Sequence, residues 1–224
     1  MDTTINDVLR AHDKEGYLIV VSDRSVQHTH QMSFGWVLAT ADGVHLAKSC
    51  GGCDGRGSSL RAEAVGMLSI SIFITLMAKH RKRTDIKIVY VSDNLQLINT
   101  SKEHRNYKNP YPNNTLSSEF DITEQIYQTN NTYKIDASFQ HVFGHQDTKS
   151  RGEMSIEAKL NVETDRLAGQ YQDDRGAYSP ITHMYPLSPA VLEINGMTIT
   201  SNIRHHLVKV YADPKYMRYL QQKK

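Results

Sequence analysis

The sequence predicts an α/β domain built on a mixed five-stranded sheet. Three observations lead to this fold class. Short β-branched runs alternate with longer segments of helical periodicity. The first three runs follow one another with no helix between them, whereas helices separate the later ones, as expected of strands joined by crossovers. The predicted order of elements is therefore βββ-α-β-α-β-α, with flanking helices and a C-terminal extension.

The first three predicted strands form an antiparallel meander. The first is a buried, β-branched run that ends at Asp23, and an Asp42-Gly43 turn joins the other two. Asp-Gly between apolar runs is a strong hairpin signal, because both turn positions require a positive φ. The predicted strands cover residues 17–23, 33–40 and 44–50.

Helices and two further strands follow the meander. The first helix is apolar at i, i+3 and i+4 and begins after Ser58 or Ser59, either of which is a suitable N-cap. The fourth strand is predicted to run parallel to the first and ends at Asp93. The predicted helices cover residues 58–79, 94–104, 116–131 and 155–172, and the predicted strands cover 86–93 and 135–145.

The chain changes character at residue 173. A loop-like segment leads into a hairpin through Asn195-Gly196 and then into a basic helical tail. We therefore predict two parts, a domain over residues 1–172 and an extension of loop, hairpin and basic helix over residues 173–224.

Composition limits the possible classes of protein only weakly. The chain has 224 residues, 39% of them hydrophobic, and a formal charge of +2, which neither demands nor excludes nucleic acid. No apolar run approaches the roughly 20 residues of a membrane helix, and the polar N-terminus does not look like a signal peptide. Cys50 and Cys53 are interpreted as reduced thiols in a turn, with zinc binding, a disulfide and redox chemistry as less favoured alternatives.

Four acidic residues are candidate metal ligands. Asp23 and Asp93 each end a predicted strand, and Glu63 and Asp165 lie on predicted helices. Acids so placed can converge in space, and converging carboxylates need cations between them. Hard oxygen ligands favour Mg²⁺ or Mn²⁺ over zinc. The first hypothesis is therefore a metal-dependent phosphodiester hydrolase, with Asp147 or Glu157 as alternatives for the fourth ligand.

The motifs VVSDRS, RAEA, VSDN, FGHQD and NVETDRLA, in this order, resemble those of ribonuclease H over roughly residues 16–172. The resemblance implies cleavage of the RNA strand of RNA–DNA hybrids with two Mg²⁺ ions, or Mn²⁺ in their place, leaving 5′-phosphate and 3′-hydroxyl ends. It implies that Asp23 bridges both ions and that Asp93 holds the nucleophile-side ion. It further implies that Glu63 and Asp165 hold the leaving-group-side ion and that His145 assists proton transfer or product release.

The same resemblance implies contacts with the nucleic acid around the acids. Hydroxyl and amide groups would read the 2′-hydroxyls of the hybrid, and Ser59 is the best single candidate. Family members often have Gly where this chain has Arg24, so a side chain here would crowd the substrate or contact phosphate. The implied contact residues are Arg24, Arg56, Ser58, Ser59, Arg61 and Asn94.

Within the family, the chain resembles domains carried by the reverse-transcriptase polyproteins of retrotransposons, especially those of diatoms. This implies an intracellular setting, in cytoplasm or nucleus, and a reverse-transcriptase domain as a partner in the same polyprotein. One alternative is a non-catalytic scaffold of the same fold that binds nucleic acid or protein. Another is a related nuclease or integrase that acts on DNA.

Overall fold

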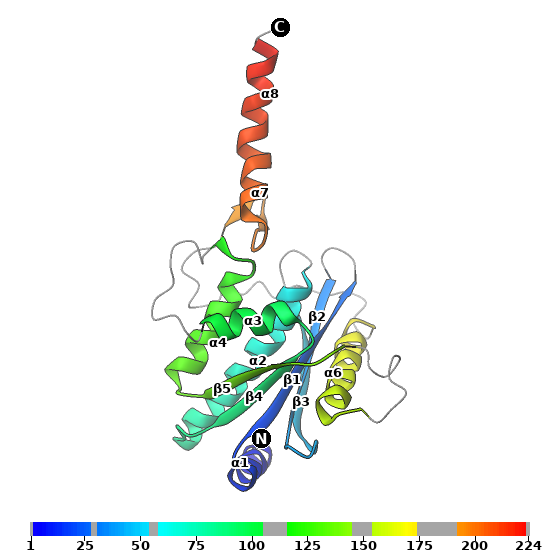
Figure 1. The fold of residues 1–224 in the computed structure, drawn as a ribbon, viewed down its shortest axis with the longest axis vertical. Coiled ribbons are helices and arrows are strands. Elements are labelled where there is room, and N and C mark those ends of the chain that lie inside the picture. The colour runs from blue at the N-terminus through cyan, green and yellow to red at the C-terminus, as the bar shows by residue number, and fades with distance from the viewer. Residues whose placement is uncertain are drawn as a thin grey trace.

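The predicted mixed five-stranded sheet is confirmed in a computed structural model of the chain (Figure 1). The structure describes residues 2–27, 31–53, 58–104, 116–144, 154–173 and 192–222. The strand order is β3-β2-β1-β4-β5. The strands are β1 (Leu18–Gln27), β2 (Gln31–Ala39), β3 (His45–Cys53), β4 (Lys87–Ser92) and β5 (Asp136–His141).

Strand pairing explains why acids at the strand ends come together. The β1–β2 and β2–β3 pairs are antiparallel, while β1–β4 and β4–β5 are parallel. The parallel ladder between β1 and β4 ends at the pair Val21–Val91. Asp23 and Asp93 each lie two residues beyond this last pair, so both lie at the same end of the parallel ladder, although β1 runs on beside β2 to Gln27 and does not end at Asp23 as predicted.

Helices cover both faces of the sheet (Figure 1). On one face the core includes Leu18 and Val20 together with side chains of the first four helices. On the other, Ile19 and Val21 pack with residues of α6. This alternation along β1 is the two-residue period of a strand buried on both sides. The helices are α1 (Asp2–Glu15), α2 (Ser59–Arg81), α3 (Leu95–His104), α4 (Phe120–Thr132) and α6 (Ile156–Asp173).

Glycines let α2 and α6 approach the sheet closely. A Cβ on Gly35 of β2 would lie 2.4 Å from the carbonyl oxygen of Thr164 in α6. A Cβ on Gly66 of α2 would lie 3.1 Å from the Cβ of Phe34 and 3.3 Å from that of Ser22. At one point, therefore, each helix approaches the sheet as closely as it does only because one partner of the contact is a glycine.

The first turn of α2 begins as predicted. Ser58 is the N-cap, and its Oγ accepts a hydrogen bond from the Arg61 backbone N–H at 3.3 Å. The expectation that no apolar run approaches membrane-spanning length is wrong for α2, which could cross a membrane by length and composition. However, 78% of its most apolar window is buried inside the protein. We therefore interpret it as the core helix of the domain.

Helix α1 was not predicted from the sequence. Ile5 and Val8 are buried in the core, and the His12 Nε2 accepts a hydrogen bond from the Lys87 N–H at 3.0 Å. Gly16 then ends the helix with φ +80°. The apolar spacing and this terminal glycine were signals available in the sequence.

Strand β3 extends further than expected. The predicted strand ended at residue 50, but pairing with β2 continues to Cys53. A Cβ on Gly51 would lie 2.8 Å from the Phe34 ring, so glycine lets that ring lie over the strand. Cys50 and Cys53 therefore lie on a strand rather than in a turn, and they form no disulfide.

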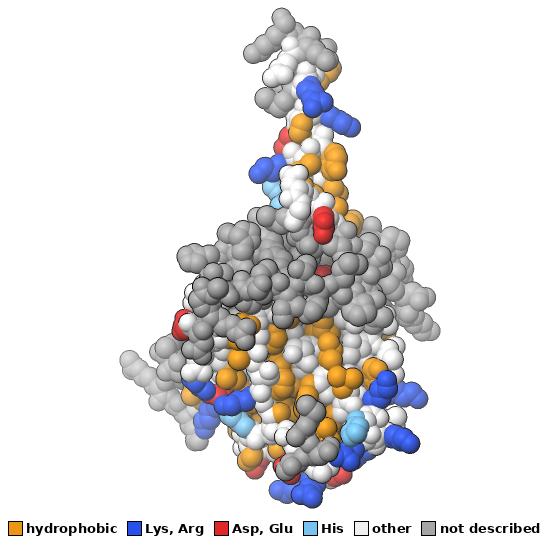
Figure 2. Space-filling view, turned by 180° about the vertical axis from the view of Figure 1, so that it is seen from behind, with side chains coloured by type: hydrophobic (Ala, Val, Ile, Leu, Met, Phe, Trp, Pro, Cys, Tyr) orange, Lys and Arg blue, Asp and Glu red, His pale blue; other side chains and the backbone are white. Residues whose placement is uncertain are grey.

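The described part of the extension contains a hairpin and a long helix. Strands β6 (Glu193–Ile194) and β7 (Met197–Thr198) flank Asn195-Gly196, whose φ values of 53° and 75° fit the predicted turn. Helix α7 (Ile203–Leu207), a π-helical turn (Val208–Ala212) and α8 (Asp213–Gln222) then project from the domain (Figure 1). Figure 2 shows hydrophobic and basic side chains mixed along this projection.

Candidate metal centre

Three carboxylates meet just beyond the last pair of the parallel β1–β4 ladder. They belong to Asp23 on β1, Glu63 on α2 and Asp93 after β4. One ligand oxygen from each lies within 4.8 Å of those of the other two. Three of the four predicted acids are thus brought together from three separate elements.

Asp23 lies at the buried centre of this group. Its side chain is 3% exposed, and burial raises its pKa to about 8, with the charges of Asp93 and Glu63 adding to the effect. The Arg24 backbone N–H donates to Asp23 Oδ1 at 2.7 Å, and the Asn161 Nδ2 donates to Oδ2 at 3.2 Å. These two bonds fix the orientation of the carboxylate.

Glu63 is held by neutral donors and by one cation. Ser92 Oγ donates to Oε2 at 2.6 Å, and Asn94 Nδ2 donates to Oε1 at 3.3 Å. Arg24 Nε lies 3.1 Å from Oε1. Burial raises the pKa of Glu63 to about 7, although the Ser92 hydrogen bond and the Arg24 charge act in the opposite direction.

Asp93 is less buried than the other two acids, and the backbone around Gly144 packs against it. A Cβ on Gly144 would lie only 2.2 Å from Asp93 Oδ2. The backbone oxygen of Asp93 also lies 3.1 Å from His141 Nε2. The glycine of the FGH motif therefore has a steric role beside a candidate ligand.

The two remaining predicted catalytic residues, Asp165 and His145, are not among the converging acids. Asp165 lies on α6, one turn after Asn161, and its charge contributes to the raised pKa of Asp23. It is not among the three acids whose ligand oxygens converge. His145 lies outside the described residues, as does the alternative ligand Asp147, and both assignments stay predictions.

The predicted nucleic-acid contacts fall into several groups. Arg24, Ser59 and Asn94 lie beside the acids: Arg24 Nε donates to Ser59 Oγ, and Asn94 bonds Glu63. Ser58 caps α2 with its hydroxyl. Arg56 lies outside the described residues.

For Arg61 the structure requires a correction. Its side chain is almost fully buried, and its guanidinium donates to Glu119 Oε2 at 2.9 Å and to Asp121 Oδ2 at 3.1 Å. It therefore ties α2 to α4 rather than facing a substrate. The helical phase of α2 explains this, because Arg61 lies half a turn away from Glu63 on the helix.

Sequence reasoning missed Asn161 and Ser92, which orient the ligands. Asn161 lies four residues before Asp165, and residues four apart share one face of a helix. Ser92 immediately precedes Asp93 and bonds Glu63 from across the site. Neither polar side chain carries a signal of its own, but their spacing to predicted ligands was visible.

The acid group fits divalent cations of the Mg²⁺ or Mn²⁺ type. All of its ligand atoms are carboxylate oxygens, the donor type that such hard ions select. Burial and mutual repulsion make three carboxylates so close together costly unless positive charge is supplied. The raised pKa values of Asp23 and Glu63 mean that both groups resist ionisation here, and a bound cation would favour their charged forms.

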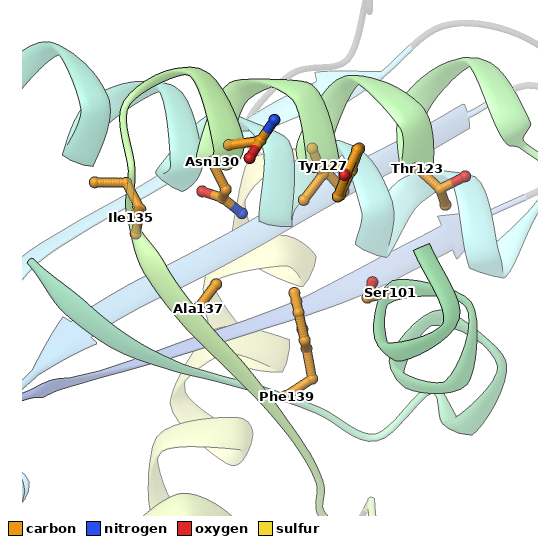
Figure 3. A pocket seen from close by; sticks show the side chains of 9 residues that line it. Ser101, Thr123, Tyr127, Asn130, Ile135, Ala137 and Phe139 are labelled. Atoms are coloured by element: carbon orange, nitrogen blue, oxygen red, sulfur yellow. The ribbon is translucent and has the colours of Figure 1, made fainter. Parts of the chain in front are cut away.

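A separate cavity of about 160 Å³ lies between α3, α4 and β5 (Figure 3). Thr123, Tyr127 and Asn130 from α4 face Phe139 from β5 across it (Figure 3). None of the predicted site residues lines it.

Comparison with protein-family models and with curated proteins gives no match. Among solved structures, LC11-RNase H1, isolated from compost by a metagenomic approach, aligns with a TM-score of 0.53 at 14% identity, over 72% of this chain and 99% of that one. The prototype foamy virus protease-reverse transcriptase aligns with a TM-score of 0.51 at 18% identity, over 72% of this chain and 21% of that one. The N-terminal RNase H domain of a Mycobacterium tuberculosis protein aligns with a TM-score of 0.47 at 18% identity, over 70% and 94%.

The first two alignments agree with the sheet order and with the helices on both faces. The comparisons do not support the narrower resemblance to diatom retroelements. The chain has the ribonuclease H fold.

Proposed function

We propose that this chain is a metal-dependent endoribonuclease that cuts the RNA strand of RNA–DNA hybrids and leaves 5′-phosphate and 3′-hydroxyl ends. The observation that carries the proposal is the convergence of Asp23, Glu63 and Asp93 at one sheet edge of a ribonuclease H fold. LC11-RNase H1 has been solved in complex with an RNA/DNA hybrid, and so has the foamy viral protease-reverse transcriptase. The converging acids and these two hybrid complexes favour an RNA–DNA hybrid as the substrate.

The residues of the chain divide the work of holding and orienting the reactants. Two divalent ions, when bound, supply an activated water and stabilise charge on the leaving oxygen. Asp23, oriented by Asn161, would contact both ions, and Asp93 would hold the nucleophile-side ion. Glu63 and Asp165 would hold the leaving-group-side ion. His145 would assist proton transfer or product release.

Recognition of the hybrid would use groups beside these acids. Ser59 Oγ and Asn94 Nδ2 both lie within hydrogen-bond reach of Arg24 or Glu63, so their side chains border the acid group. Hydroxyl and amide groups suit the 2′-hydroxyls of an RNA strand. Arg24 suits a phosphate, since its guanidinium side chain is one-third exposed.

The wider context is proposed from the same resemblance. The foamy virus protein is a protease-reverse transcriptase, and this chain aligns with 21% of it. We propose a reverse-transcriptase domain as a partner within one retrotransposon polyprotein, in an intracellular compartment. The domain of residues 1–172 would carry the chemistry, and the extension of residues 173–224 would adjust affinity or solubility.

A cleavage assay tests the proposal. Labelled RNA–DNA hybrid, RNA duplex and DNA duplex are incubated with the wild type in Mg²⁺, in Mn²⁺ and in EDTA. Asp93→Asn is compared with Asp85→Asn, a matched control, because Asp85 precedes β4 as Asp93 follows it. Asp85 bonds only the exposed Arg83 among the contacts described for its side chain.

We expect hybrid-specific cutting with Mg²⁺ or Mn²⁺, its loss in EDTA and in Asp93→Asn, and wild-type rates in Asp85→Asn. Equal cutting of all three duplexes would contradict hybrid specificity. Binding of hybrid without cleavage under every condition would favour the non-catalytic scaffold instead.

A further inference from the structure

Arg24 places a positive charge directly on a candidate metal ligand. Arg24 follows Asp23 on β1, and the alternation of a strand sends its side chain toward the opposite face, where α2 lies. Its Nε is 3.1 Å from Glu63 Oε1 and also donates to Ser59 Oγ. The Glu63 side chain is 0% exposed and that of Arg24 is 33% exposed, so the cation lies at the rim and the anion inside.

Both oxygens of the Glu63 carboxylate already have partners, and Arg24 is the only charged one among them in the contacts described. Oε2 already accepts a short 2.6 Å hydrogen bond from Ser92. Oε1 accepts only a 3.3 Å hydrogen bond from Asn94 besides its contact with Arg24. A divalent ion bound to Oε1 would therefore meet a like charge on the guanidinium, and the two charges would repel each other.

We infer that Arg24 is a resident counterion of Glu63, which holds the acid group together without metal and which an arriving divalent ion must displace. The inference rests on the proposed function, in which Glu63 is a ligand. Ser59 anchors the guanidinium in the paired position. The partial exposure of Arg24 gives it a route outward, toward solvent and the side where a phosphate would lie.

Two consequences follow for a protein in which this charge is removed. Without metal, a buried carboxylate that has lost its partner destabilises the fold. With metal, the ion no longer competes with the guanidinium, so it binds more tightly. A purely structural salt bridge would show the first effect without the second.

The experiment measures metal binding and thermal stability without nucleic acid. Mn²⁺ and Mg²⁺ are titrated into the wild type, Arg24→Met and Arg24→Lys by calorimetry, and melting temperatures are recorded in EDTA and in excess metal. Arg24→Met keeps length and removes charge, and Arg24→Lys is the control that keeps the charge. Ser59→Ala is a milder variant that releases the guanidinium without removing it.

We expect Arg24→Met to melt lower than the wild type in EDTA and to bind ions on the order of tenfold more tightly, which corresponds to about 1.4 kcal/mol. Arg24→Lys should stay near the wild type, and Ser59→Ala should show a smaller gain in affinity. Unchanged or weaker binding by both Arg24→Met and Ser59→Ala would overturn the inference while leaving the proposed function standing. Absence of any binding to the wild type would overturn both.

Discussion

Replacing Asp23 by Asn should make the metal-free protein more stable above neutral pH. Burial and three neighbouring acids raise the pKa of Asp23 from an ordinary value of 3.8 to about 8. Between pH 3.8 and about pH 8, Asp23 keeps its proton in the folded state but has released it in the unfolded state. Stability therefore falls as pH rises through this window, and a neutral side chain at this position removes that loss.

The structure sets the size of this effect. The interval from the ordinary pKa of 3.8 to pH 7 is about 3 units. At about 1.4 kcal/mol per unit, the wild type loses about 4 kcal/mol of unfolding free energy across this interval. The hydrogen bonds survive the change. An amide oxygen still accepts from the Arg24 N–H, and Asn161 Oδ1, which has no partner among the described residues, can accept from the new amide nitrogen once the Asn161 amide turns over. We therefore expect Asp23→Asn to gain about 2 to 4 kcal/mol at pH 7 to 8.

Urea unfolding of the wild type and the variant at pH 5 and pH 8, in EDTA, measures the effect. The wild type should lose stability between the two pH values, and Asp23→Asn should lose much less. Adding Mg²⁺ should stabilise the wild type at pH 8 and the variant far less, because ion binding favours the folded state of the protein that can bind it. Parallel pH dependences, or a variant less stable at pH 8, would refute the reasoning.

Two further changes test the neighbourhood of the acids. Gly144→Ala places a Cβ 2.2 Å from Asp93 Oδ2, so we expect the carboxylate to shift and ion affinity to fall at least severalfold; unchanged calorimetric affinity would contradict this. Arg61→Met leaves Glu119 buried without its cation and should cost about 3 to 5 kcal/mol in urea unfolding. The exposed Arg10→Met is its control, and a similar small loss in both variants would show that the buried ion pair matters little.

Periodicity and turn chemistry were enough to predict the sheet and most helices. Asn195 and Gly196 both have the positive φ expected of their turn, whereas in the Asp42-Gly43 turn only Gly43 does. Helix α1 was missed although its apolar spacing and Gly16 were visible, because its apolar residues are few and most of its stability comes from packing on the core. The extra length of β3 depends on the fit of Phe34 over Gly51, a contact between strands that only the folded chain reveals.

The candidate site was predictable where strand ends determine position. Asp23 and Asp93 follow the same ladder pair, so the sheet alone brings them together. Arg61 was misplaced because a sequence motif says which residues adjoin Glu63 but not which side of the helix they occupy. Asn161 and Ser92 act through hydrogen bonds to acids on other elements, so their spacing to Asp165 and Asp93 was visible in the sequence but their bonding partners were not.

The two glycine contacts beneath the acid-bearing helices have an evolutionary consequence. Gly66 lets α2 approach the Cβ atoms of Phe34 and Ser22, and Gly35 lets the backbone of α6 approach β2. A larger side chain at either position would push its helix, and with it Glu63 or Asp165, away from the sheet. We therefore expect both positions to be held as glycine during evolution.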